Sequence, residues 1–150
     1  MSLKETINEE MKAAMKSGDK LRLETVRSIR ALILDFEKSG AAREMTPDEE
    51  IQLLNTAVKK RKEALELFKA NNRPELAEKE ALEYAILMEF LPKQLTEEEA
   101  LAEVKILAQE LGATGKEHFS KLMPAAMKAL KGKADGKIVR SLVEKLLGIN

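Results

Sequence analysis

Two glutamates and one arginine come closest in this sequence to a reactive group. Glu80 and Glu83 interrupt an apolar stripe of helical spacing, and Arg61 interrupts a similar stripe earlier in the chain. If the two stripes pair as an antiparallel hairpin that turns near residue 72, Arg61 falls opposite both glutamates. Two carboxylates could act as an acid–base pair, but no histidine, serine or third carboxylate shares their stripe. We therefore favour a structural ion pair of Arg61, Glu80 and Glu83, which specifies the register of the hairpin.

No other residues form a recognisable catalytic or metal site. His118 is the only histidine and the sequence has no cysteine, so a zinc or iron–sulfur site lacks its usual ligands. The serines do not lie in a nucleophile elbow, and the glycines form neither a phosphate-binding loop nor a dinucleotide fingerprint. We expect His118 to be a surface residue. The sequence predicts no catalytic residue, metal or cofactor, which favours a protein that is not an enzyme.

Positive charge gathers near the end of an otherwise neutral chain. The sequence has 26 basic and 26 acidic residues, yet from residue 112 onward eight basic residues face three acidic ones. Lys131, Lys133 and Lys137 converge where the sixth expected helix ends and the seventh begins, at a helix start with free N–H groups. A phosphate could bind there. Alternatively, the corner is solvated and Asp135 already caps the helix.

Two further groups of basic residues are ambiguous in the sequence. Arg22, Arg27 and Arg30 could contact phosphate or pair with Glu24 and its neighbours. The run Lys59–Lys62 lies within one helix, so its side chains point around the axis, and a solvated helix is favoured over a localisation signal. Aromatic residues are only 3% of the chain, which argues against a base-stacking platform.

The elements that must position these residues are all helical. Capping-box spacing occurs at three helix starts, and glycines follow the ends of the helical stretches. We expect Gly132 and Gly136 to form the last joint, with Asp135 as the cap of the final helix. The expected helices are 2–16, 20–39, 47–71, 74–91, 97–111, 116–131 and 136–147. Pro124 should kink the sixth helix or split it near Met123.

The segment Leu91–Leu95 is the expected boundary between two domains. It separates four longer helices from three shorter ones. The predicted fold is therefore all-α, with a four-helix bundle in residues 1–92 followed by a three-helix bundle in residues 93–150. The absence of cysteine, of a signal peptide and of about 20 consecutive apolar residues predicts a soluble, cytoplasmic protein without membrane contact.

Several of these residues together resemble the GatB/YqeY family. The run Lys131–Lys137 (Lys-Gly-Lys-Ala-Asp-Gly-Lys), with Val139 and the leucines and valine that follow, closely resembles the family's tail. Leu91–Leu95 (Leu-Pro-Lys-Gln-Leu) looks like its linker. Further matches in the first domain are Arg22, Leu23, Arg27, Arg61, Phe68, Arg73, Leu76, Ala77, Lys79, Glu80 and Glu83. The likeness covers nearly the whole chain and suggests a stand-alone member. The chain departs from the family at Ser120 and Pro124, where a small residue is common, so its sixth helix is expected to bend differently.

The resemblance implies a four-helix bundle followed by a three-helix bundle, and it implies a function. In the glutamine-dependent tRNA amidotransferase, the equivalent tail of GatB helps to hold tRNA, while amide transfer belongs to a separate catalytic domain and a glutaminase subunit. A label such as carbon–nitrogen ligase with glutamine as amido-N-donor could therefore attach to this chain by descent.

The leading hypothesis is a non-catalytic module that binds tRNA or another structured RNA. The expected RNA-binding residues are Lys121, Lys128, Lys131, Lys133, Lys137 and Arg140. A second hypothesis is a protein–protein accessory of an amidotransferase or an aminoacyl-tRNA synthetase. A third is a true amidotransferase, which requires a catalytic group that the sequence does not reveal.

Overall fold

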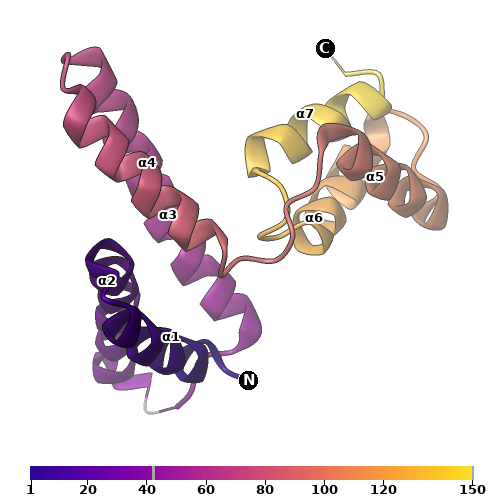
Figure 1. The fold of residues 1–150 in the computed structure, drawn as a ribbon. Coiled ribbons are helices and arrows are strands. Elements are labelled where there is room, and N and C mark those ends of the chain that lie inside the picture. Colours follow the sequence, from indigo (N-terminus) through magenta and orange to yellow (C-terminus); the bar gives the residue numbers. More distant parts are fainter. Residues whose placement is uncertain (42, 150) are drawn as a thin grey trace. The chain divides into compact units, whose positions relative to one another are not determined.

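Every regular element that the structure describes is a helix (Figure 1), which confirms the all-α class. The structure is a computed structural model, and it describes residues 1–41 and 43–149. The α-helices are α1 (Leu3–Ser17), α2 (Lys20–Phe36), α3 (Pro47–Ala70), α4 (Pro74–Met88), α5 (Glu97–Leu111), α6 (Phe119–Ala129) and α7 (Gly136–Leu146). The chain divides into two units, Met1–Leu91 with α1 to α4 and Pro92–Asn150 with α5 to α7. Among the described residues, no helix combines the length and apolar character that a membrane span needs.

Side-chain caps define the helix starts. Ser2 and Glu5 form a full capping box at α1, and Thr46 and Glu49 form another at α3. At α5, Thr96 accepts a hydrogen bond from the Glu99 backbone, but the Glu99 carboxylate bonds the Thr96 hydroxyl instead of completing the box. These local hydrogen bonds satisfy backbone N–H groups of the first helical turn, which have no acceptor within the helix.

Three predicted helices differ in detail from the structure, although their ends fall within the about 2–4 residues that the prediction allows. The second helix stops at Phe36, and a π-helical turn (Glu37–Ala41) with Gly40 at φ 94° follows it. The fourth ends at Met88 because residues 89 and 90 form a turn before Pro92. The predicted helix 116–131 is a 3₁₀ turn (Lys116–His118) followed by α6. Pro124 lies inside α6 without splitting it, which removes one of the two outcomes expected for this proline.

The N-terminal unit consists of two antiparallel helical hairpins. α1 packs on α2, α3 packs on α4, and α2 contacts α4 (Figure 1). Its buried cluster is centred on Ile7, Ile29, Ile33, Leu54 and Leu87. The α3–α4 hairpin extends well beyond this cluster, since the apolar residues that α3 contributes to it end at Val58. The distal part of the hairpin therefore stabilises itself largely through contacts between α3 and α4.

The C-terminal unit has a denser core. α5, α6 and α7 contact one another in all three pairs. Val104, Leu122, Ala126, Leu130 and Val143 are fully buried between them. α7 places its apolar residues on a single face, which is the pattern expected of a helix that covers a core.

Candidate nucleic-acid interface

The segment between α6 and α7 forms a fixed turn. We call this segment together with the adjoining ends of the two helices, residues 128–137, the lysine turn. Leu130 is fully buried and its carbonyl accepts hydrogen bonds from Lys133 N at 2.9 Å and Ala134 N at 3.2 Å. Gly132 follows with φ 76°, a left-handed conformation that side-chain-bearing residues rarely adopt. The turn is therefore shaped by its own backbone hydrogen bonds and by this glycine.

A second segment of the same unit holds the lysine turn in place. Gln94 Nε2 donates to the Gly132 carbonyl at 2.6 Å and to the Pro92 carbonyl at 2.9 Å. Leu95 N donates to the Lys133 carbonyl at 2.9 Å. The residues before α5 thus satisfy two backbone acceptors of the turn, although about 38 positions separate them in the sequence. The linker motif Leu91–Leu95 and the tail motif Lys131–Lys137 therefore contact each other at this point.

Four of the six predicted RNA-binding side chains have no partner within the described part of the chain. The amines of Lys128, Lys131, Lys133 and Lys137 make neither an ion pair nor a hydrogen bond there, Lys128 and Lys137 being exposed and the other two half-buried. Half-burial of a lysine covers its aliphatic stem and leaves the charged amine in water. The lysine turn therefore presents four uncompensated positive charges.

The other two predicted residues are engaged within the unit. Lys121 Nζ donates to the Leu111 carbonyl at the end of α5, at 3.0 Å. Arg140 Nε lies 3.0 Å from Glu144 Oε1 on the next turn of α7. Each contact uses one donor, so Lys121 keeps two N–H groups and Arg140 keeps its Nη1 and Nη2 donors, while Glu144 offsets the charge of Arg140.

Asp135 occupies the start of α7. Its Oδ1 accepts a hydrogen bond from Lys137 N at 2.8 Å, so the capping alternative raised from the sequence is present in the structure. The carboxylate also adds a negative charge where a phosphate would have used the helix dipole. The positive charge of this corner therefore lies on the lysine side chains, and Asp135 offsets part of the charge at the start of α7.

Gly136 lets an apolar side chain lie against the turn. A Cβ added at Gly136 would lie 3.1 Å from Met127 Cε, closer than most real contacts of this kind. Met127 and Ile138 are both substantially exposed despite their apolar character. The lysine turn is consequently flanked by two exposed apolar side chains as well as by charge.

Arg61, Glu80 and Glu83 come together in the α3–α4 hairpin. Arg61 Nη1 lies 2.6 Å from Glu83 Oε2 and 3.2 Å from Glu80 Oε2. The contact with Glu83 lies outside hydrogen-bond geometry, and no other donor among the described residues reaches this buried oxygen. Burial raises the pKa of Glu83, and the neighbouring Glu80 adds to this, while Arg61 opposes it. The two carboxylates are thus shared by one guanidinium at the inner face of the hairpin.

Arg22 on α2 links α1 to the residue that follows α4, a role that the sequence left open. Its guanidinium lies 2.8 Å from Glu10 on α1 and 2.8 Å from Glu89 just after α4. Hydrogen bonds to Glu89 and Glu10 raise the pKa of Arg22. Arg22 is thus paired with glutamates, but with Glu10 and Glu89 and not with the expected Glu24. The partners are distant in sequence, so no short motif could have indicated them.

His118 stabilises the turn that precedes α6. Its Nδ1 accepts hydrogen bonds from Thr114 N at 3.2 Å and Gly115 N at 3.3 Å, which closes the turn before α6. No three histidine, aspartate or glutamate side chains among the described residues are arranged to hold a metal ion.

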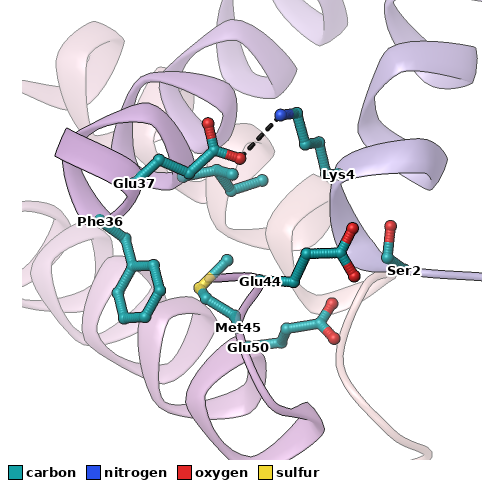
Figure 2. A pocket seen from close by; sticks show the side chains of 8 residues that line it. Ser2, Lys4, Phe36, Glu37, Glu44, Met45 and Glu50 are labelled. Carbon is teal, nitrogen blue, oxygen red and sulfur yellow. Dashed lines mark hydrogen bonds and ion pairs between the residues drawn. The ribbon is translucent and has the colours of Figure 1, made fainter. Parts of the chain in front are cut away.

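A small acidic cavity lies between the start of α1 and the turn that precedes α3. Figure 2 shows Glu37, Glu44 and Glu50 around it, together with Lys4 and Phe36. Its volume of about 30 Å³ is that of a single water molecule. Lys4 Nζ pairs with Glu37 at 2.7 Å, and Glu50 accepts a hydrogen bond from Leu3 N. These contacts hold the start of α1 against Glu37 and Glu50. The cavity itself is too small for an organic ligand.

The fold and these contacts define an all-helical protein of two units, the second of which presents a basic turn fixed by its own linker. Comparison with known families then identifies the chain. The model of the Yqey-like protein family matches residues 4–147, so the chain belongs to the YqeY-like family, as its motifs suggested. The chain is also 28% identical, over 142 residues, to altered inheritance of mitochondria protein 41, mitochondrial, of Pyrenophora tritici-repentis. This match covers 93% of the chain and 77% of the relative.

Proposed function

We propose that the C-terminal unit binds structured RNA, with tRNA as the first candidate, through the lysine turn. The observation that supports this most directly is the set of four lysine amines without an internal partner, on a turn whose backbone is fixed by Gln94 and Leu95. Lysines that contact phosphates position a nucleic acid without reading its sequence. The resemblance of this segment to the tRNA-holding tail of GatB selects tRNA among structured RNAs. The proposal assigns binding to this unit and no reaction.

The proposal is tested by titrating fluorescein-labelled unfractionated tRNA with the full chain and recording anisotropy. Four phosphate contacts should lower the affinity about a hundredfold between 50 and 200 mM salt, because each contact releases condensed counterions. The double variant Lys131→Glu/Lys133→Glu should abolish binding at 50 mM salt.

A matched control separates this site from general charge. Lys105 and Lys116 are exposed lysines of the same unit outside the lysine turn. The double variant Lys105→Glu/Lys116→Glu changes the net charge equally and should weaken tRNA binding no more than about threefold. Undiminished binding by the first double variant, or an equal loss in the control, would refute the lysine turn as the site.

A second candidate function is an accessory that docks on an amidotransferase or a synthetase through the N-terminal unit. It is supported by three exposed leucines of the α3–α4 hairpin, Leu67, Leu76 and Leu82. Purification of the tagged chain after nuclease treatment tests this candidate, because an RNA-bridged enzyme would be lost and a directly docked one retained. We propose the cytoplasm as the location of this chain, although the fungal relative is named as mitochondrial.

A further inference from the structure

A groove of about 500 Å³ opens on the N-terminal unit between α2, α3 and the end of α4. Its apolar surface comes from Leu32 on α2, Leu53 and Ala57 on α3, and Leu87 on α4. Leu87 is buried beneath it, whereas Leu32 and Leu53 are only half-buried. None of the residues that line the groove belongs to the lysine turn or to the exposed leucines of the α3–α4 hairpin.

The groove exists because the two hairpins pack unevenly. α2 packs against α1 and α4 but touches α3 at few positions. The α3 residues on that side, Leu53 and Ala57, pack against the core cluster but are only half-buried. One more helix laid between α2 and α3 would cover these side chains, as neighbouring helices do in a bundle.

The charged residues that line the groove are both cations, Lys60 and Arg61. Lys60 is exposed and has no ion pair among the described residues. Arg61 uses only Nη1 for Glu80 and Glu83, so within the described chain its Nε and Nη2 donors have no acceptor. The two hydroxyls in the lining are already committed, since Ser28 donates to the Thr25 carbonyl and Thr56 to the Gln52 carbonyl.

From this combination we infer that the groove binds an acidic amphipathic helix of a partner protein. The apolar face of that helix packs on Leu32, Leu53 and Leu87, and a flanking carboxylate pairs with Lys60 and the unused donors of Arg61. An open groove fits a helix better than a small amphiphile, because sites for small ligands usually enclose most of the ligand's surface. The inference rests neither on RNA binding by the lysine turn nor on docking through Leu67, Leu76 and Leu82.

The probe for this site is a labelled synthetic helix of about 18 residues, with leucines at spacings of three and four and glutamates on both flanks. Fluorescence anisotropy with the full chain should show saturable binding. The same peptide with lysines in place of the glutamates should bind at least about tenfold more weakly. Backbone NMR shifts should centre on α2 and on the part of α3 near Leu53.

A neighbouring pair of lysines provides matched variants. Lys60→Glu should weaken the acidic peptide about fivefold or more, because it replaces an attraction with a repulsion. Lys59→Glu makes the same charge change one residue away, at an exposed position that does not line the groove, and should leave the affinity within about twofold. Leu53→Ala, with its fold verified by circular dichroism, should also weaken the peptide.

Three results would overturn the inference. The first is no saturable binding of the acidic peptide, or shifts that centre outside the groove. The second is equal loss in Lys59→Glu and Lys60→Glu, which would indicate attraction by general charge. The third is displacement of the peptide by oleate together with oleate-induced shifts in the groove, or a dimer in sedimentation that the peptide dissociates. These would assign the groove to a small amphiphile or to a second copy of the chain.

Discussion

The two units of this chain use their apolar residues differently. In the C-terminal unit, eleven buried residues form one cluster within fewer than 60 positions. The N-terminal unit is half as long again, yet its buried cluster has eight members, and a groove and a long hairpin lie outside it. Among the described residues, the buried polar or charged side chains, Thr25 and Glu83, both belong to the N-terminal unit.

This difference indicates how each unit can work. A dense core fixes the backbone of a turn, so the lysine turn can present charges at set positions without a partner. A unit with a smaller core leaves apolar surface half-covered, which favours binding another element. The C-terminal unit is therefore a scaffold for an exposed charged turn, whereas the N-terminal unit has an interior that a partner can complete.

The largest expected effect comes from the C-terminal core. Leu130 is fully buried, and Leu130→Ala should lower the free energy of unfolding by about 3 kcal/mol through lost burial and an added cavity. Hydrogen exchange read by mass spectrometry should show loss of protection in α5, α6 and α7 only. Leu67→Ala, at a position 62% exposed, is the control and should change stability by less than about 0.5 kcal/mol. Equal loss of protection in α1 to α4 would contradict the description of two separate units.

A substitution of Arg61 tests the ion pair in the interior of the N-terminal unit. Arg61→Ala should cost about 2 kcal/mol, because it leaves the Glu83 carboxylate buried without a counter-charge. The cost is smaller than for a fully buried pair, since the Arg61 side chain is 31% exposed. Denaturant unfolding followed by circular dichroism measures it.

Removal of the buried charge provides the control for Arg61. The double variant Arg61→Met/Glu83→Gln should recover part of the lost stability, because the buried Glu83 charge is removed and only the half-buried Glu80 carboxylate is left without a counter-charge. If the unfolding midpoint of Arg61→Ala equals that of the unmodified chain, the ion pair has no structural role.

The smallest effect distinguishes two glycines of the lysine turn. Gly132→Ala should cost about 1 kcal/mol because its φ of 76° strains any side chain, and it should also weaken tRNA binding by disturbing the turn. Gly136→Ala requires only that the flexible tip of Met127 move, so its unfolding midpoint should stay nearly unchanged. Similar losses in both variants would show that the left-handed backbone is not what makes Gly132 necessary.

The sequence permitted much of the local structure to be predicted. The all-α class was correct, and the side chains of Ser2, Thr46, Thr96 and Asp135 cap the helices expected of them. The proximity of Arg61 to Glu80 and Glu83 could be expected because a tight hairpin couples position in sequence to position in space. The family was also identifiable from short motifs.

Other features had no local signal. The contact of Gln94 with Gly132 and the bridge from Arg22 to Glu89 join residues far apart in the chain. The hydrogen bond from Lys121 to the Leu111 carbonyl at the end of α5 depends on how α5 and α6 pack. The end of α2 at Phe36 was missed because the π-helical turn Glu37–Ala41 follows it directly, and Gly40, the glycine that marks the end in the sequence, lies inside that turn.

By itself the sequence determined the helices, most of their ends, the neutral total charge and the basic concentration after residue 112. These follow from interactions that span about four residues, such as caps, apolar spacing and the backbone freedom of glycine. Only the tertiary structure decided which lysines lack partners, which carboxylate is buried and where a groove stays open. Each of these depends on which helix faces meet, and that is set by the packing of the whole unit.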